Sequence, residues 1–322
     1  MSDISPLEDD IFKIFDGKNK KTWNILNCYI HELIMKTKKD PEALNILKEY
    51  LAKNPEEINC QNNHGWTPLH ITCQNNHGWT PLDRTCKYSN KDIVERIVEI
   101  LLSHPDININ LQCKTGETPL HWLCKYSDKD ITERTVALFL EHPDININLQ
   151  NNNGYAPIHV ACIYNNIRLF GMLLMHSTIK VNLRSKDGET ALIFACKKYG
   201  SNEKIIELLL SHHKIDINLQ NRWGESALSC ACGNTIRQGS EIIVELLLEY
   251  PNININLQDN FGMTALHLAC RYSGKYSTER TVELLLAHSN INVNLRDSKG
   301  RSVLHLACRY SKEKIVKMLL GF

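Results

Sequence analysis

Apolar and polar positions along this chain repeat with a long period, and each period contains two short helical patterns. The motif that opens a period has Thr, Ser or Ala first, Leu or Ile two residues later, and often a His after that. Its first residues are spaced by 38, 38, 34, 36, 38 and 38 positions: Thr80, Thr118, Ala156, Thr190, Ser226, Thr264 and Ser302. Self-similarity at such a period is the signature of a repeat protein.

Residues 262–299 show what one period predicts. The segment ALHLAC at 265–270 has the apolar character of a buried helix, and Thr264 stands where it can cap that helix. A second helix follows a polar stretch, because Val282, Leu285 and Leu286 recur at helical spacing. An extended return and a turn complete the unit. One helix pair cannot bury both of its faces, whereas stacked copies can, so the pattern predicts an all-α solenoid.

The motifs in these units resemble those of the ankyrin repeat family over residues 60–322. They are TPLH at 67–70 and 118–121, ALHLAC at 265–270, VLHLAC at 303–308 and IVELLL at 243–248. The resemblance implies an ankyrin-repeat solenoid with finger hairpins, whose concave face binds a partner protein. It also implies that the His of each TPLH-like motif bonds turn backbone and ties neighbouring units: His70, His121, His159, His267 and His305.

The chain divides into four parts on this interpretation. Residues 1–21 form an N-terminal arm, and residues 22–59 form a helix-pair cap, because 22–36 and 42–53 keep a degraded version of the pattern. Residues 60–72 are a partial duplicated unit. Residues 73–322 hold about seven ankyrin units, of which the last is a C-terminal cap.

A direct duplication interrupts the period near residue 70. CQNNHGWTPL runs from Cys60 to Leu69 and again from Cys73 to Leu82. We expect the second copy to open a complete unit and the first to be an extra turn and helix start without a second helix. The two copies could compete for one place in the stack, so one docks and the other forms a loop; the sequence leaves open which one docks.

The duplication also raises an alternative based on metal chemistry. Cys60, His64, Cys73 and His77 form a plausible tetrahedral zinc set by residue type. A duplication creates such a paired set automatically, however, without any need for metal. We therefore predict no metal, no cofactor and no small-molecule substrate, and a metal-dependent enzyme is the least favoured of the function classes.

One Cys recurs at the end of each inner-helix motif. These residues are Cys86, Cys124, Cys162, Cys196, Cys232, Cys270 and Cys308. Adjacent members should lie about one repeat apart, too far for a disulfide. We predict that they pack in the core as small hydrophobic side chains.

After these cysteines, a basic residue and a Tyr recur and would form a stripe along the ends of the stacked inner helices. The residues are Lys87, Tyr88, Lys125, Tyr126, Tyr164, Arg271, Tyr272, Arg309 and Tyr310. One interpretation is local helix-end chemistry, since cations suit the C-terminal carbonyls of a helix. The other is a contact strip for an acidic partner, because Tyr and Arg are frequent interface anchors. A nucleic acid is a further alternative ligand for the stripe.

Aromatic residues flank the turn glycines of the predicted fingers. They are Trp66, Trp79, Tyr155, Trp223 and Phe261. The ankyrin resemblance places them on fingers that line the concave face. They either contact a partner or pack between neighbouring fingers, and together with the stripe they are the predicted partner-binding residues.

The composition and the absence of catalytic motifs argue against several classes of function. There are 37 Lys and Arg residues against 36 Asp and Glu residues, which argues against a mainly electrostatic polyanion binder. No Gly-rich phosphate loop, G-x-S-x-G or H-E-x-x-H motif is present. The acidic start MSDISPLEDD has no apolar core typical of a secretory signal, and no segment has the length of a membrane span. We therefore expect a cytoplasmic protein-interaction scaffold and not an enzyme.

The style of the repeats suggests a source. The long units with HPDININLQ and the abundance of Asn, Ile and Lys resemble ankyrin proteins of large DNA viruses of amoebae, or of protists and intracellular bacteria. That resemblance implies a viral or effector protein directed at a host partner.

Overall fold

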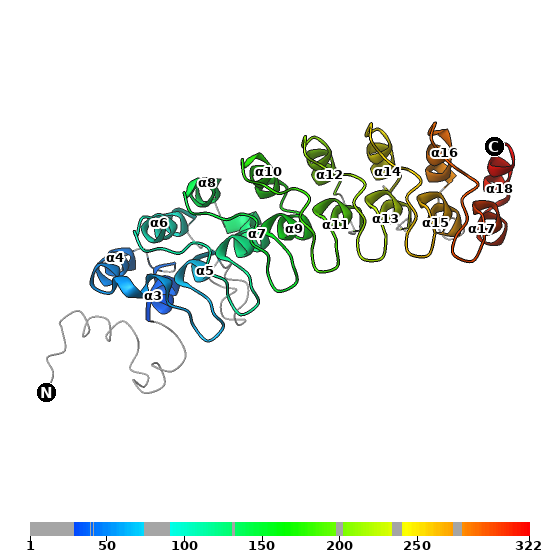
Figure 1. The fold of residues 1–322 in the computed structure, drawn as a ribbon. Helices are drawn as coiled ribbons and strands as arrows, with labels where there is room; N and C mark the ends of the chain where they lie inside the picture. The colour runs from blue at the N-terminus through cyan, green and yellow to red at the C-terminus, as the bar shows by residue number, and fades with distance from the viewer. Residues whose placement is uncertain are drawn as a thin grey trace, which may run out of the picture.

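The computed structural model describes residues 29–38, 40, 42–73, 91–130, 133–197, 202–233, 240–272 and 279–322. Within these residues the chain consists of helices and loops and contains no strand; two isolated β-bridges lie in the finger turns. The helices stand in two parallel rows, and hairpin fingers project from one of the rows (Figure 1). The array curves toward the side that carries the fingers, so the fingers and the nearby helices line its concave face.

Each repeat contributes one helix to the inner row, beside the fingers, and one helix to the outer row. The inner row contains α3 (Tyr29–Thr37), α5 (Pro68–Cys73), α7 (Pro119–Asp130), α9 (Pro157–Ile163), α11 (Ala191–Lys197), α13 (Ala227–Gly233), α15 (Ala265–Tyr272) and α17 (Val303–Tyr310). The outer row contains α4 (Ala43–Lys53), α6 (Lys91–Leu102), α8 (Glu133–Glu141), α10 (Ile167–Met175), α12 (Glu203–Leu210), α14 (Ser240–Leu248), α16 (Glu279–Ala287) and α18 (Glu313–Leu320). A short 3-10 helix, η1 (Pro55–Asn59), follows α4.

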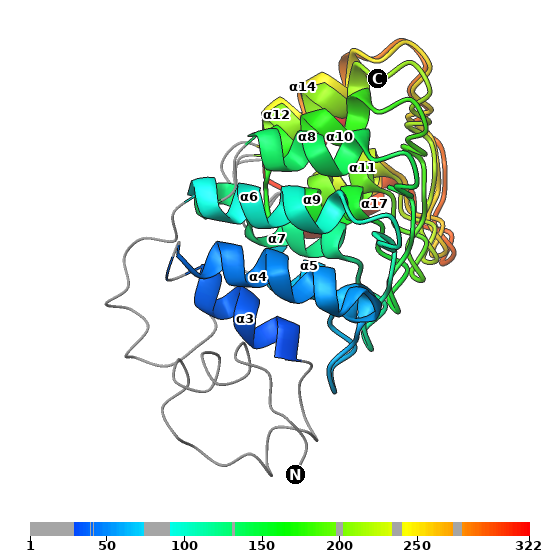
Figure 2. The ribbon, with the colours of Figure 1, turned by 90° about the vertical axis from the view of Figure 1, so that its left-hand side faces the viewer.

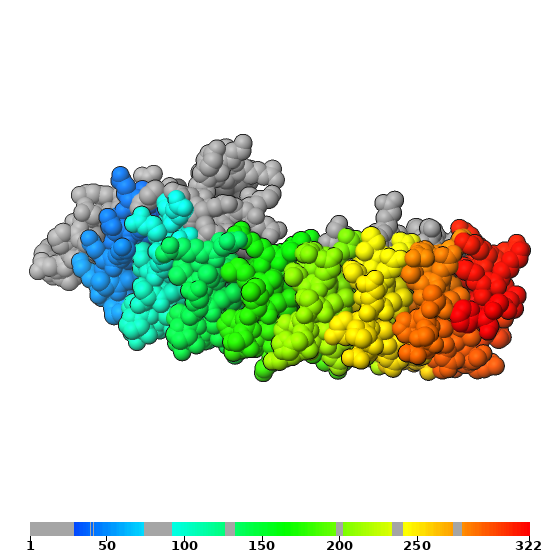
Figure 3. Space-filling model, turned by 90° about the horizontal axis from the view of Figure 1, so that it is seen from above, coloured from blue at the N-terminus to red at the C-terminus, as the bar shows by residue number. Residues whose placement is uncertain are grey.

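The core is a continuous apolar layer between the two rows. Phe139, Phe170 and Leu173 are fully buried there, as are most apolar residues that recur at helical spacing. Each repeat forms a slab across the molecule and packs against the preceding and the following repeat (Figure 3). The fingers overlie one another when the array is viewed from its N-terminal end (Figure 2). The predicted all-α solenoid is therefore confirmed, and its physical basis is the burial of both helix faces by stacking.

The His of the TPLH motif links one repeat to the next, as the resemblance implied. Nδ1 of His121 accepts a hydrogen bond from the Thr118 backbone N–H at 3.0 Å, and Nε2 donates to the Tyr155 carbonyl in the following finger at 2.8 Å. His70 makes the equivalent pair of bonds, and His159 accepts from the Ala156 N–H but donates to the Leu183 carbonyl, in the return segment before the next finger. The ring must be neutral to accept through one nitrogen and donate through the other.

A ladder of side-chain amides fixes the extended return segments to one another. In these segments an Asn donates through Nδ2 to a backbone carbonyl of the next repeat, and its Oδ1 accepts the N–H of the residue two positions after that carbonyl. The six members are Asn59, Asn110, Asn148, Asn182, Asn218 and Asn256. Because each amide forms both bonds to the next repeat, the ladder fixes the spacing of the fingers.

We expect Asn148→Asp to destabilise the protein by about 1–2 kcal/mol. Asn148 donates to the Thr178 carbonyl at 2.8 Å and accepts from the Lys180 N–H at 2.9 Å. A carboxylate keeps the second bond but faces the Thr178 oxygen with negative charge. The measurement is the free energy of unfolding from urea denaturation followed by circular dichroism.

Asn146→Asp is the matched control for this prediction. Asn146 uses Oδ1 to accept from the Asn148 N–H, and Asp216 makes the same bond to Asn218 in another repeat. A carboxylate is therefore compatible with this position, and the change should be nearly neutral. Equal destabilisation by the two substitutions would contradict a specific role for the Asn148 amide donor.

The first copy of the duplicated segment holds a place in the stack. Its helix α5 lies between α3 and α7 in the inner row and also packs against α6 in the outer row. Lys38 donates to the carbonyl of Ile71 at 2.7 Å, which ties α5 to the end of α3. We expected residues 60–72 to have no second helix, and the packing against α6 corrects that expectation. The second copy lies outside the described residues.

The recurring cysteines pack in the core, with one exception at the last repeat. Cys124, Cys162, Cys196, Cys232 and Cys270 are buried, whereas Cys308 is exposed. The sequence prediction was wrong for Cys308, because among the described helices α17 packs against α15 on one side and no inner helix packs on its other side. Cys86 lies outside the described residues. Burial raises the pKa of the Cys270 thiol to about 12, which keeps it protonated and unreactive.

Candidate functional site

The finger aromatics divide into two groups according to their side of the turn glycine. Trp66 and Tyr155 follow the glycine and pack against inner helices. The Trp66 ring meets Trp122 edge-on at 4.9 Å, and the Tyr155 ring meets Phe194 edge-on at 5.3 Å. These two rings are partly buried: each packs against the core and keeps part of its surface accessible. Trp79 lies outside the described residues.

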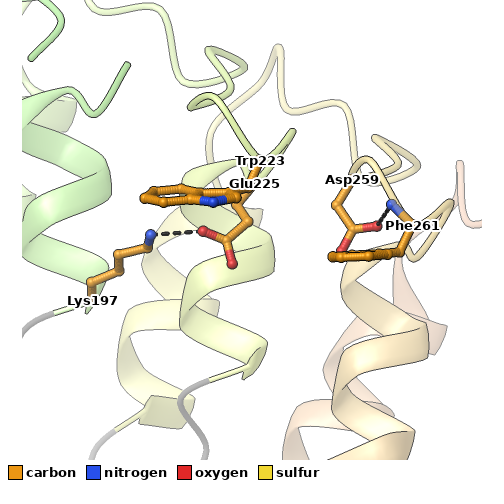
Figure 4. A pocket seen from close by; sticks show the side chains of 5 residues that line it. All are labelled: Lys197, Trp223, Glu225, Asp259 and Phe261. Carbon is orange, nitrogen blue, oxygen red and sulfur yellow. Dashed lines mark hydrogen bonds and ion pairs between the residues drawn. The ribbon is translucent and has the colours of Figure 1, made fainter. Parts of the chain in front are cut away.

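Trp223 and Phe261 precede the glycine and are exposed at neighbouring fingertips. Their relative exposures are 37% and 61%. Between them is an open hollow of about 280 Å³ lined by Lys197, Trp223, Glu225, Asp259 and Phe261. Figure 4 shows the Trp223 ring on one finger and the Phe261 ring lower in the view on the next finger, with the Glu225 carboxylate below Trp223 and Lys197 reaching up from α11. We call this feature the Trp–Phe hollow.

Lys197 connects the inner helices to the fingers. Its ammonium lies 2.7 Å from a carboxylate oxygen of Glu189 and 2.6 Å from one of Glu225, on two successive fingers. Partial burial disfavours the charge, but the hydrogen bonds to Glu189 and Glu225 outweigh it and raise the pKa of Lys197. Burial likewise opposes the Glu225 charge, and the bonds from Lys197 and Asn221 overcome it and lower the pKa of that carboxyl. Both groups are therefore charged at neutral pH.

Cations already lie against the Trp223 ring. The Lys197 ammonium is 4.9 Å from the ring centroid and the Arg222 guanidinium is 4.2 Å from it. Arg222 is also held by Asp187, at 2.5 Å, on the preceding finger. These contacts fix the orientation of the indole although it is exposed, which lowers the entropy lost when a partner binds to it.

Asp259 occupies the start of the next finger turn. Its Oδ1 accepts the backbone N–H groups of Phe261 and Met263, both at 2.8 Å. The carboxylate therefore holds the turn in shape and places the Phe261 ring at its tip (Figure 4).

The basic and aromatic stripe is present only in segments. Lys125 lies 5.7 Å from the ring centroid of the exposed Tyr164. Arg271 lies against Tyr272 at 5.7 Å, and Arg309 lies against Tyr310 at 5.3 Å. Gly233 stands at the corresponding position of α13, so no cation joins these segments there. Lys87 and Tyr88 lie outside the described residues, as does the side chain of Tyr126 in α7.

Sequence reasoning identified Trp223 and Phe261 but not Lys197, Glu225 or Asp259. Lys197 follows the recurring Cys196, as Lys125 follows Cys124, so alignment of the cysteines is the sequence signal that could have identified it. Its contact with a finger carboxylate depends on the stacking of two repeats, which no alignment shows. The structure thus brings Lys197, at the position after a recurring cysteine, against the fingertip residue Trp223 at the Trp–Phe hollow.

The described ranges contain neither a cluster suited to a metal ion nor a helix suited to cross a membrane. There, no group of three or more His, Cys, Asp and Glu side chains is arranged to hold a metal ion, and His77 of the duplicated set lies outside these ranges. Cys73 of that set is buried in the core, and burial raises the pKa of its thiol to about 12. None of the helices in the described ranges has both the length and the apolar character needed to cross a bilayer.

The stacked helix pairs, the projecting fingers and the concave face define a helical repeat protein. The chain belongs to the ankyrin repeat family, because the family model described as ankyrin repeats (3 copies) matches residues 82–185, 173–259 and 235–322. Domains of this family are commonly scaffolds for protein–protein interaction, typically bind protein partners and are generally not enzymes.

Solved structures of other proteins share this fold. The ankyrin repeat domain of Bcl-3, described as a unique member of the IkappaB protein family, is 24% identical with a TM-score of 0.60, over 80% of this chain and 100% of that chain. An ankyrin repeat domain from Acinetobacter baumannii AYE is 27% identical with a TM-score of 0.54, over 63% of this chain and 96% of that chain.

A third similar structure is a chain from the solved complex of a predatory endopeptidase from Bdellovibrio bacteriovorus with an immunity protein. That chain is 21% identical with a TM-score of 0.50, over 65% of this chain and 98% of that chain. A search among curated proteins gave no match.

Proposed function

We propose that this protein is a binding scaffold whose concave face, centred on the Trp–Phe hollow, engages a partner protein. The observation that carries the proposal is the exposure of Trp223 and Phe261 on adjacent fingers, where the hollow separates them. Exposed aromatic rings in a pre-oriented setting are the typical anchors of protein interfaces. Rigid fingers held by the amide ladder also limit the ordering cost of binding. The style of the repeats makes a host-cell protein the class of partner we favour, with the binding taking place in the cytoplasm.

The alternative, a nucleic-acid or acidic ligand on the basic stripe, has less support. Lys197 forms ion pairs with two carboxylates, those of Glu189 and Glu225, and Gly233 interrupts the stripe in the next repeat. Nucleic-acid binding through phosphates requires adjacent uncompensated cations and gives an affinity that falls steeply with salt.

The double substitution Trp223→Ala with Phe261→Ala should weaken partner binding at least about tenfold while leaving the fold intact. Immobilised wild-type protein is used to capture partners from host-cell lysate, and the captured protein is then purified and its affinity measured by calorimetry. Circular dichroism and urea denaturation establish that the variant is folded.

The matched control removes two exposed apolar side chains from the outer row. Met175 of α10 and Ile242 of α14 have exposures of 88% and 47%, so Met175→Ala with Ile242→Ala removes similar apolar surface from the other side. Binding should be unchanged in this control. Loss of binding in the outer-row variant alone, or in neither variant, would contradict the proposed surface.

A further inference from the structure

Two consecutive fingers offer a natural comparison of the same acidic position. Asp259 and Asp297 each start a finger turn, and each uses Oδ1 to accept the backbone N–H groups two and four residues later. The distances are 2.8 Å to Phe261 and Met263, and 2.9 Å to Lys299 and Arg301. The backbone surroundings of the two carboxylates are therefore alike.

The two carboxylates differ in what lies on the second oxygen. Oδ2 of Asp297 receives the guanidinium of Arg301, with Nε at 2.7 Å and a terminal nitrogen at 2.6 Å. At the corresponding position the Asp259 finger has Met263, and within the described part of the chain no side chain donates to Oδ2 of Asp259. Asp259 thus lacks the cation that its equivalent in the next repeat has.

The aromatic walls beside Asp259 suit a guanidinium group. Arg222 already stacks on Trp223 at 4.2 Å, which shows that this ring attracts a planar cation. Phe261 is more exposed than Trp223, and Figure 4 shows its ring directly below the Asp259 carboxylate, with the ring edge toward Trp223 and Glu225. A guanidinium that bonds to Asp259 would lie within reach of the Phe261 ring face.

The charge around the hollow is negative. Among the side chains that line the hollow, Glu225 and Asp259 are acidic and Lys197 is basic, so one negative charge is uncompensated, and Lys197 is also shared with Glu189 outside the lining. Arg222 and Asp187 neutralise each other. An acidic or neutral side chain would gain little here, whereas a cation is attracted.

We propose that the Trp–Phe hollow receives an arginine side chain of the partner, which bonds to Asp259 as Arg301 bonds to Asp297 and stacks on Phe261. This inference rests on the proposed function and deepens it by specifying the partner's chemistry. The partner surface at this point is basic, in contrast to the acidic surface that the Lys/Arg–Tyr stripe suggested.

The probe for this inference is blocked arginine, N-acetyl-arginine amide, added to the full chain labelled with ¹⁵N. The indole N–H signal of Trp223, assigned by its loss in Trp223→Phe, should shift saturably with a dissociation constant on the order of millimolar. Blocked citrulline, which has nearly the same shape but no charge, should not shift it. Blocked lysine should bind more weakly, because an ammonium cannot form the paired bonds or stack as a plane.

Asp259→Asn should weaken arginine binding roughly tenfold without unfolding the finger, because it removes a charged hydrogen-bond acceptor. Asn stands at the equivalent positions 151 and 221 and makes the same two backbone bonds there, so the amide preserves the turn. Asp144→Asn, at an exposed Asp on another repeat, is the matched control and should bind like the wild type.

Three outcomes of these experiments would overturn the inference. Absence of a shift up to the solubility limit of blocked arginine, equal binding of blocked lysine, or equal affinity in Asp259→Asn and wild type would exclude an arginine site. If any of these results is obtained while Trp223→Ala with Phe261→Ala still abolishes partner binding, the proposed function stands and the arginine assignment falls. If arginine binds but that double variant keeps its partner, the proposed function fails instead.

Discussion

Gly154→Ala should destabilise the protein by more than about 2 kcal/mol. Gly154 has a φ of 77° in a finger turn, a conformation that L side chains avoid. An added Cβ would also lie 2.5 Å from the backbone nitrogen of Lys186 in the next finger. That nitrogen donates to the Asn153 carbonyl at 3.1 Å, so the methyl group would strain its own turn and push two fingers apart. The measurement is the free energy of unfolding from urea denaturation.

Two other glycines separate the cost of the positive φ from the cost of the close approach between fingers. Gly300 has a φ of 73° but nothing within 4 Å of an added Cβ, so Gly300→Ala should cost only the conformational part, about 1–2 kcal/mol. Gly171 lies inside α10 with nothing within 4 Å, and Gly171→Ala should stabilise the helix by up to about 1 kcal/mol. If Gly154→Ala proved no worse than Gly300→Ala, the close approach of the fingers would not be a source of stability.

Acidification from pH 7 to pH 5 should reduce the free energy of unfolding by several kcal/mol. Burial lowers the pKa of His70, His121 and His159 to about 4, whereas an exposed His titrates near 6.5. Between these two values the unfolded chain binds more protons than the folded chain, so stability rises with pH across this window and is lost as pH falls. At pH 5 the loss is about 2 kcal/mol for each ring, since one pKa unit corresponds to about 1.4 kcal/mol.

The control for this prediction is already present at one repeat. Ser229 stands at the position that His121 holds in its own repeat, and it is buried without a titrating ring. His121→Ser should lower stability at pH 7, because a link between two repeats is lost. It should also reduce the slope of unfolding free energy against pH by about one proton near pH 5. An unchanged slope would show that the buried rings do not set the acid sensitivity.

The outcome at individual residues shows which features a single repeat can predict. Thr264 caps α15 as its position indicated, since its hydroxyl oxygen accepts the His267 N–H at 3.3 Å. The burial of Cys124 and Cys162 followed from the same local pattern. Cys308 has the same local sequence but is exposed, because burial of an inner-helix residue requires a following repeat. Local pattern predicts which face is apolar, and the neighbouring repeat determines whether that face is buried.

The Trp–Phe hollow marks where sequence reasoning stopped. Trp223 and Phe261 were identified because aromatic residues next to a turn glycine have no core of their own to enter. Lys197 and Glu225 are 28 positions apart in the chain, and their ion pair exists only because two repeats stack with a fixed offset. Asp259 lacks the arginine that its equivalent Asp297 has for a local reason, because Met263 stands in its finger where Arg301 stands in the next one.

The sequence by itself determined the repeat period, the helix pairs, the turn glycines and the membership of a stacked helical class. These features depend on contacts within about one unit, and the same pattern recurs in about seven similar units. Only the tertiary structure decided that the first duplicated copy fills the inner row, that some finger aromatics pack while others stay exposed, and that acidic groups surround the hollow. Those features arise from distances between side chains of different repeats, and such distances are fixed by packing and by the amide ladder rather than by any one segment.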